Sequence, residues 1–239
     1  MAGKGFRRVL LKLSGETLSG PKGAGMDSSA LGFLASEIIT AKKTAREIAV
    51  VIGGGNIFRG VRSAGYSIDK KTGDYMGMLA TIINGLALRD ALVSKGCAAE
   101  VLNATPMPPI AEGYSPGRAN RLLNEGNVVI FTGGTGHPYF TTDTTGVLRA
   151  LEVGAEILLK ATKVDGVFSA DPKKDGKAKK YDILTYEEVI GRKLGVMDLT
   201  AVALARENGL EIRVFDFFKK RNLKKAVSGE KIGSAVRGG

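Results

Sequence analysis

The chain has 239 residues, 44% of them hydrophobic and 25% charged, so it has a globular composition and enough length to bury a sizeable core. It carries a net charge of +11, 33 glycines, one cysteine (Cys97) and one histidine (His137). This composition excludes an internal disulfide and a zinc site built from cysteines, and we expect Cys97 to be a small core residue. Residues 1–8 lack the apolar stretch of a signal peptide, and we see no apolar run of membrane-spanning length. We therefore expect a cytoplasmic protein without a membrane partner.

Strand-like and helix-like segments alternate along the whole chain. In chain order we predict a strand over 8–13, a helix from one of the caps Asp27, Ser28 or Ser29 to about 43, a strand over 47–52, a helix over 73–93, strands over 98–103 and 127–131, a helix over 144–152, a strand over 156–160, helices over 185–194 and 198–208, and a strand over 211–215. Runs such as Val50-Val51-Ile52 are apolar without alternation, as in strands buried on both faces. The pattern predicts a single α/β domain over residues 1–239, with a mainly parallel sheet between two helix layers (a three-layer α/β/α sandwich).

Four polar segments that contain glycine follow predicted strands, at residues 12–15, 53–60, 133–142 and 160–171. Ligands of α/β proteins bind at the carboxyl ends of the strands, so we expect these segments to gather at one edge of the sheet. Each segment has side chains suited to an anion: Lys12, Arg59, the pair Thr141 and Thr142, and Lys160. Glycine amides can cradle phosphate oxygens, and cations can neutralise developing charge. The segments predict a phosphate site, although neither a P-loop nor a Gly-x-Gly-x-x-Gly motif occurs.

Five motifs in a fixed order carry a resemblance to a known family. They are KLSG at 12–15, GGGNIFRG at 53–60, DYMGM at 74–78, GTGHPYFTTD at 134–143 and KATKVDGV at 160–167. With these motifs the chain resembles the bacterial uridylate kinases, a branch of the amino acid kinase superfamily, from residue 8 to about 236. The first and last motifs are shared with acetylglutamate, carbamate and aspartate kinases, whereas DYMGM and the 134–143 loop point to UMP. The resemblance implies the amino acid kinase fold, phosphoryl transfer from ATP to UMP, Mg²⁺ carried by ATP, and a homohexamer.

The resemblance also implies roles for individual residues. The catalytic residues would be Lys12, Lys160 and Asp143, with both lysines beside the transferred phosphoryl group and the carboxylate orienting them. The ATP-binding residues would be Lys12, Leu13, Ser14, Gly15, Gly55, Arg59, Thr162, Phe168 and Asp171. The UMP-binding residues would be Gly54, Asp74, Thr135, Gly136, His137, Pro138, Tyr139, Phe140, Thr141 and Thr142. Asp74 would accept hydrogen bonds from the ribose. His137 stands where the family often has asparagine, and Phe168 where it often has tyrosine.

Regulation by nucleotides is a further implication of the resemblance. GTP would activate the enzyme at a site between subunits, and UTP would inhibit it. The residues tied to the GTP response would be Gly20, Pro21, Lys22, Gly23, Ala24, Gly25, Arg89 and Asp90. The alternative for this set is a flexible surface loop and an ordinary salt-bridged helix.

Simpler explanations exist for three of the catalytic and binding residues. Lys12 is also explained as surface charge after a strand, and Asp74 and Asp143 as N-caps of the helices beside them.

Three rival functions stay open beside the UMP kinase prediction. A kinase with a carboxylate acceptor is disfavoured by Asp74, which suits a ribose diol and would repel an acidic amino acid. A nucleic-acid-binding protein would use the basic runs at 173–180 and 219–225, but few aromatic residues lie among these lysines, so we expect no nucleic-acid partner. A nucleotide sensor without activity would not need Lys12, Asp143 and Lys160 together.

Overall fold

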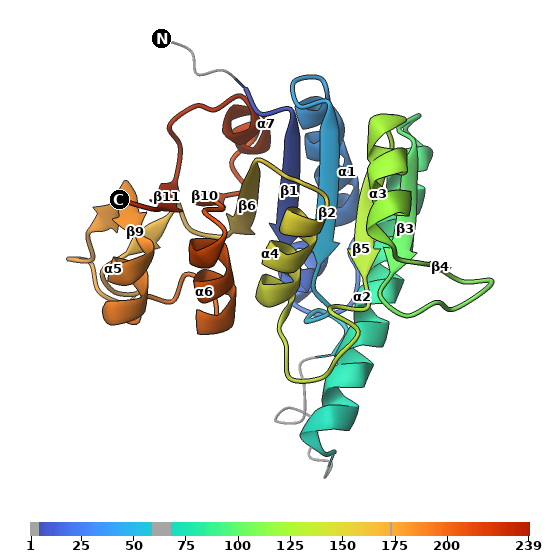
Figure 1. The fold of residues 1–239 in the computed structure, drawn as a ribbon, viewed down its shortest axis with the longest axis horizontal. Helices are drawn as coiled ribbons and strands as arrows, with labels where there is room; N and C mark the ends of the chain where they lie inside the picture. The colour runs from blue at the N-terminus through green and yellow to red at the C-terminus, as the bar shows by residue number, and fades with distance from the viewer. Residues whose placement is uncertain (1–4, 59–67, 173) are drawn as a thin grey trace.

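The computed structural model describes residues 5–58, 68–172 and 174–239, with a nine-stranded sheet through its middle (Figure 1). In spatial order the strands are β4 (Glu112–Gly113), β3 (Ala99–Asn103), β5 (Val128–Thr132), β2 (Glu47–Ile52), β1 (Arg8–Leu13), β6 (Ile157–Thr162), β10 (Ile212–Asp216), β11 (Ser234–Arg237) and β9 (Ile183–Thr185). Neighbouring strands are parallel except β10 and β11, which are antiparallel. The prediction of a mainly parallel sheet is confirmed.

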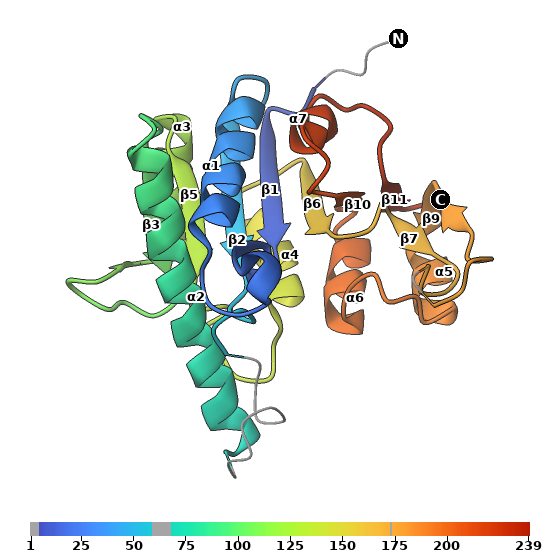
Figure 2. The same cartoon turned by 180° about the vertical axis from the view of Figure 1, so that it is seen from behind.

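Helices cover both faces of this sheet (Figures 1 and 2). One face packs against α1 (Ser28–Lys42), α2 (Lys70–Val93) and α7 (Asn222–Val227). The other packs against α3 (Pro116–Asn124), α4 (Thr142–Glu152), α5 (Tyr186–Gly191) and α6 (Leu199–Glu207). The remaining elements are the 3-10 turns η1 (Gly15–Leu18) and η2 (Gly20–Lys22) and the small antiparallel pair β7 (Val167–Phe168) and β8 (Lys180–Tyr181). This is the predicted three-layer α/β/α arrangement.

Strand residues alternate between the two cores. Val9, Leu11 and Leu13 of β1 pack against the α1 side, whereas Leu10 packs against the α4 side. All four are fully buried, which explains why the strand is apolar without alternation. Cys97 is also buried in the α1-side core, as predicted.

The caps of α2 and α4 settle the alternative explanations of two carboxylates. The N-cap of α2 is Asp69, whose side chain accepts a hydrogen bond from Thr72 N at 3.1 Å. The helix therefore begins three residues before the predicted start, and Asp74 lies inside it. The N-cap of α4 is Thr141, so Asp143 lies in the first turn and not at the cap. The capping explanation is wrong for both residues.

The long helix α2 extends past the carboxyl-end edge of the sheet (Figures 1 and 2). By length and composition alone it is apolar enough to cross a membrane, with a mean hydropathy of 1.4 over 18 residues, as core helices of other proteins also are. Part of its apolar surface is exposed, through Tyr75, Leu79 and Ile83, which recur every four residues along one side.

Candidate active site

The predicted polar segments meet where β1, β2, β5 and β6 end. The backbone N–H of Gly53, after β2, donates to Leu13 O of β1 at 2.9 Å. A Cβ on Gly15 would lie 2.5 Å from Asn56 Oδ1 and 2.6 Å from Gly53 O, so only glycine fits between these loops. The expectation that the glycine segments gather at one edge of the sheet is confirmed for the residues that the structure describes.

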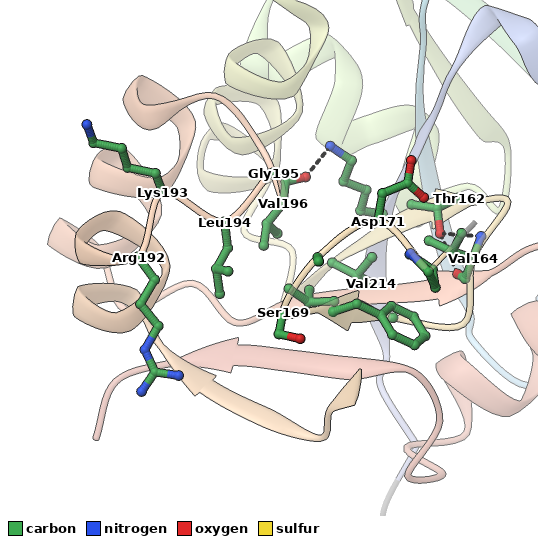
Figure 3. A pocket seen from close by; sticks show the side chains of 16 residues that line it. Thr162, Val164, Ser169, Asp171, Arg192, Lys193, Leu194, Gly195, Val196 and Val214 are labelled. Carbon is green, nitrogen blue, oxygen red and sulfur yellow. Dashed lines mark hydrogen bonds between the residues drawn. The ribbon is translucent and has the colours of Figure 1, made fainter. Parts of the chain in front are cut away.

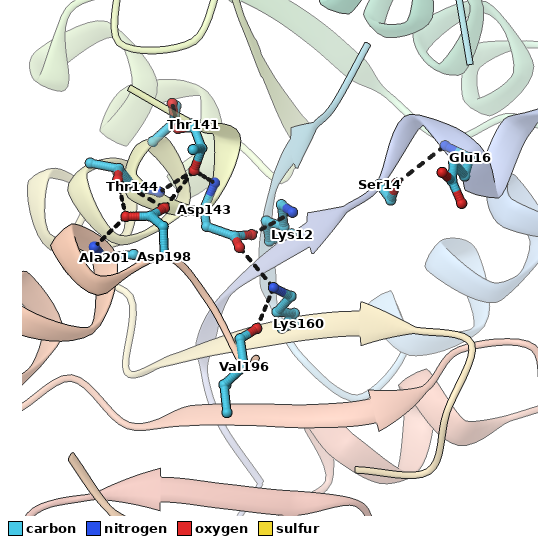
Figure 4. A network of polar contacts seen from close by, with 11 residues as sticks. Lys12, Ser14, Glu16, Thr141, Asp143, Thr144, Lys160, Val196, Asp198 and Ala201 are labelled. Atoms are coloured by element: carbon cyan, nitrogen blue, oxygen red, sulfur yellow. Dashed lines mark hydrogen bonds and ion pairs between the residues drawn. The ribbon is translucent and has the colours of Figure 1, made fainter. Parts of the chain in front are cut away.

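Two lysines and one carboxylate form a charged centre at this edge (Figure 4). Lys12 of β1 and Lys160 of β6 are direct neighbours in the strand register. Lys12 Nζ lies 2.5 Å from Asp143 Oδ1 as an ion pair without hydrogen-bond geometry, and Lys160 Nζ donates to Asp143 Oδ2 at 2.8 Å. Lys160 also donates to Val196 O. The explanation of Lys12 as surface charge is wrong, since the residue is only 8% exposed.

The ionisation of this centre follows from burial and mutual attraction. Burial opposes ionisation of the Asp143 carboxyl, but Lys12 and Lys160 outweigh it and hold its pKa below the ordinary 3.8. Burial lowers the pKa of the Lys160 ammonium below the ordinary 10.5, although Asp143 acts in the opposite direction. With all three groups ionised, two ammonium groups and one carboxylate leave one net positive charge. Such a centre suits an incoming phosphate.

Asp198 is a residue of this region that the sequence analysis missed. It caps α6 by accepting from Ala201 N at 2.9 Å, and it accepts from Thr141 Oγ1 at 2.5 Å and from Thr144 Oγ1 at 3.0 Å (Figure 4). It therefore joins the start of α6 to the start of α4, beside the charged centre. The sequence predicts a helix from residue 198 but offers no signal for the contacts to α4.

A cavity of about 410 Å³ lies next to the charged centre, since Lys160 lines it. Figure 3 shows the residues around this cavity. Its lining includes Thr162, Phe168 and Asp171, which were predicted to bind ATP, and Lys160, which was predicted to be catalytic. The segment from Arg192 to Val196 also lines this cavity and was not predicted.

Other predicted ATP residues lie outside this cavity. Leu13 is fully buried in the core, and Ser14 caps η1 by accepting from Glu16 N at 3.3 Å. Gly15 is buried between the glycine loops, and Gly55 lines a second cavity. Arg59 lies outside the described residues.

The second cavity, of about 210 Å³, lies between α2 and the 134–143 loop. Five predicted UMP residues line it: Gly54, Asp74, Phe140, Thr141 and Thr142. A Cβ on Gly54 would lie 2.7 Å from both Ala80 Cβ and Gly77 O, so this glycine permits the close approach of α2. Residues of the lining that were not predicted to bind UMP are Gly55, Phe58, Gly73, Gly77, Met78, Thr81 and Gly134.

Five predicted UMP residues lie in the same loop but do not line the second cavity: Thr135, Gly136, His137, Pro138 and Tyr139. Thr135 Oγ1 accepts from His137 N at 3.2 Å, and His137 is exposed. Tyr139 adopts a positive φ of 72°, and its N–H donates to Asp74 Oδ2 at 2.7 Å. That bond ties the loop to α2.

The candidate GTP loop, residues 20–25, contacts the glycine loop after β2, residues 53–58, through Asn56. Asn56 Nδ2 donates to Gly25 O at 2.8 Å, and Gly25 N donates to Asn56 O at 2.8 Å. Asn84 of α2 donates to Asn56 Oδ1 at 2.7 Å and to Gly53 O at 2.8 Å. On the same helix, Arg89 is half-buried and Asp90 is exposed.

A metal cage built from protein side chains finds no support in the described part of the chain. Residues 5–58, 68–172 and 174–239 contain no group of three or more His, Cys, Asp or Glu side chains placed to hold an ion. Both oxygens of Asp143 face lysines.

Residues 7–216 match the amino acid kinase family. A uridylate kinase of Parabacteroides distasonis is 52% identical over 231 residues, which cover 97% of this chain and 98% of that protein. The crystal structure of UMP kinase from Bacillus anthracis superposes with a TM-score of 0.94 at 39% identity, covering 98% of this chain and 97% of that one. The UMP kinase from Ureaplasma parvum gives 0.91 at 34% identity, with 97% and 99% covered. The chain therefore belongs to the amino acid kinase family, within its uridylate kinase branch.

Proposed function

We propose that this protein transfers the γ-phosphoryl group of ATP to the phosphate of UMP, giving ADP and UDP. The observation that carries the proposal is the place of the charged centre between two cavities. Lys160 lines the larger cavity, and Thr142, next to Asp143 in the chain, lines the smaller one. A donor nucleotide in one cavity and an acceptor in the other would bring their phosphates together at the two lysines.

The chemistry needs no strong general base, because the acceptor oxygen of UMP is already anionic near neutral pH. Catalysis then consists of positioning and of neutralising charge along the line of transfer. Lys12 and Lys160 supply the charge, and Asp143 orients both ammonium groups. Val196 O accepts from Lys160 and so restricts where that ammonium points.

The larger cavity is the proposed ATP site. Phe168 offers an aromatic face for adenine, and Thr162 and Asp171 line the same space. Leu13, Ser14, Gly15, Gly55 and Arg59 are proposed to act on the ATP phosphates. Mg²⁺ would arrive as a complex with ATP, which is usual for an ion that keeps several waters and binds phosphate oxygens. It would neutralise phosphate charge there.

The smaller cavity is the proposed UMP site. Asp74, which lines this space, would accept from the ribose hydroxyls, and the 134–143 loop would surround base and phosphate. Donors around Asp74 support its charged form: burial opposes ionisation, but Tyr139 N–H and Lys70 outweigh it and lower the pKa. A fixed anion here disfavours the acidic acceptors of other amino acid kinases.

Assembly, regulation and location complete the proposal. A homohexamer is supported by the exposed apolar side chains Tyr75, Leu79 and Ile83 on α2, which a second subunit would cover.

Activation by GTP and inhibition by UTP rest on the resemblance, and the contact between Gly25 and Asn56 offers a route from the GTP loop to the glycine loop. The continuous nine-stranded sheet supports a single domain, and a cytoplasmic location is proposed with it.

The acceptor preference tests this proposal. A coupled assay of ADP release would compare UMP with CMP, AMP, GMP and N-acetylglutamate at equal concentrations. We expect release with UMP to exceed release with every other acceptor. Release with N-acetylglutamate and none with UMP would contradict the proposal and identify a carboxylate kinase.

A further inference from the structure

The Asp74 carboxylate is held by donors from two directions. Tyr139 N–H donates to Oδ2 at 2.7 Å. Lys70, one helical turn before Asp74, lies with its Nζ 3.0 Å from Oδ2 and 3.3 Å from Oδ1. The same ammonium lies 5.2 Å from the centroid of the Tyr139 ring, within cation–π range. Lys70 therefore joins the first turn of α2 to the 134–143 loop through both partners.

These contacts use most of the acceptor capacity of the carboxylate. An ionised carboxylate has about four lone-pair sites. Tyr139 N–H takes one on Oδ2, and Lys70 takes one on each oxygen, so about one site is left, on Oδ1. A ribose that donates from both of its hydroxyls needs two sites. Lys70 must then give up at least one contact when the ribose binds, whereas a sugar with one donating hydroxyl fits the remaining site.

We infer that Lys70 competes with the ribose hydroxyls for Asp74, and so sets both the affinity for UMP and the discrimination between ribose and deoxyribose. The inference rests on the proposed function, because it takes the smaller cavity as the UMP site. Lys70 is a specificity-determining residue in this account and not a catalytic one. It acts on the ligand through the carboxylate that both of them contact.

The expected size of the effect follows from the exposure of the ion pair. The side chains of Lys70 and Asp74 are 65% and 26% exposed. Exposed ion pairs of this kind change an equilibrium constant by up to about five-fold, and their effect weakens as the salt concentration rises. Removing Lys70 should therefore tighten UMP binding by about two- to five-fold at low salt, and by less at high salt.

Loss of a positive charge also weakens the general attraction of an anionic nucleotide, so the test needs a matched control. Lys71 is the next residue, exposed on the same helical turn, and its ammonium makes none of the Asp74 contacts described above. Lys70→Met and Lys71→Met remove the same charge at neighbouring positions. The difference between the two variants isolates the contact with Asp74.

Calorimetric titration of wild type, Lys70→Met and Lys71→Met with UMP, dUMP and ATP tests the inference. We expect Lys70→Met to bind UMP about two- to five-fold more tightly than Lys71→Met, to gain less for dUMP, and to bind ATP equally. In an Asp74→Asn background, the difference between the two lysine variants should shrink.

Two results would overturn the inference while leaving the kinase proposal intact. One is equal affinity of the two variants for UMP, and the other is weaker UMP binding by Lys70→Met, which would make the lysine a direct ribose partner. If wild type binds ATP but no UMP, the proposed acceptor and the role of Lys70 both fall.

Discussion

At the scale of single residues, Lys160 differs from an ordinary lysine because its ammonium is buried beside Asp143 and a backbone carbonyl. The sequence marks Lys160 only as a cation after an apolar strand, and the resemblance gives it a role. Residue types and spacing alone do not predict that Asp143 contacts Lys160, because residues 143 and 160 come from different elements; only the resemblance implies that this carboxylate orients the lysines. The same limit explains why Asp198, whose partners Thr141 and Thr144 are distant in the chain, was missed.

The lowered pKa of Lys160 gives a pH dependence. As pH rises through that pKa, below 10.5, the ammonium loses its proton and the transferred group loses its cation, so turnover should fall. Lys160→Arg stays charged over this range, and its residual turnover should lack the fall. Turnover of wild type and Lys160→Arg, measured at saturating nucleotide from pH 7 to 10.5, checks this. Ionisation of the nucleotides themselves affects both enzymes equally, so it does not produce a difference between the two profiles. Parallel profiles would show that Lys160 does not limit turnover at alkaline pH.

The lowered pKa of Lys160 also makes the free energy of unfolding depend on pH. A lysine whose folded pKa lies below its unfolded pKa binds fewer protons in the folded state between the two values. The free energy of unfolding should therefore rise with pH across that window, which ends near the ordinary 10.5. Asp143 acts differently, because its lowered pKa adds stability above 3.8 that is lost as pH falls through the folded pKa.

At the scale of elements, strongly apolar segments were predicted well and weakly apolar ones were not. Strands β1 and β2 have the predicted bounds, because their side chains are buried on both faces. Helix α3 was missed, although Ser115 and Pro116 form a typical helix start, since its buried face consists of only three residues, Ala119, Leu122 and Leu123. Strands β4, β9 and β11 are two to four residues long and have too little pattern to predict.

The buried amide pair that joins α2 to the glycine loop gives a prediction at this scale. Asn84 is fully buried, and Asn84→Ala would leave Gly53 O and the Asn56 side chain without this partner. Unsatisfied buried groups cost about 1–3 kcal/mol, so the free energy of unfolding in urea should fall by about that amount. Asn208→Ala, which removes an exposed amide from the end of α6, should change it little. Equal losses in the two variants would contradict the role given to Asn84.

At the scale of the whole molecule, alternating strands and helices were enough to predict the layered sheet but not its strand order. The antiparallel β11 and the two separate cavities depend on how distant segments pack. A pattern in one segment carries no information about such contacts. The family resemblance predicts which residues belong to the site, and the structure gives the distances between them.

Regulation by GTP belongs to the assembled molecule. If the loop at residues 20–25 and Arg89 serve a GTP site, GTP should raise turnover or shift the saturation curves of UMP or ATP in wild type. Arg89→Ala should reduce that response and leave basal turnover nearly unchanged. Initial rates with and without GTP measure both effects. A wild-type enzyme whose rates and saturation curves ignore GTP would refute the regulatory role.

The central prediction is that the γ-phosphoryl group of ATP is transferred to UMP between the two cavities. Lys12 and Lys160 neutralise its charge, and Asp143 orients both lysines. Following label from the γ-phosphate of ATP, in wild type and in Lys160→Ala with both nucleotides saturating, tests it most directly. The account predicts label in UDP, formed on the order of 10²–10³ times more slowly by the variant, with nucleotide affinities nearly unchanged. Label found only in inorganic phosphate, or equal rates in the two proteins, would contradict it.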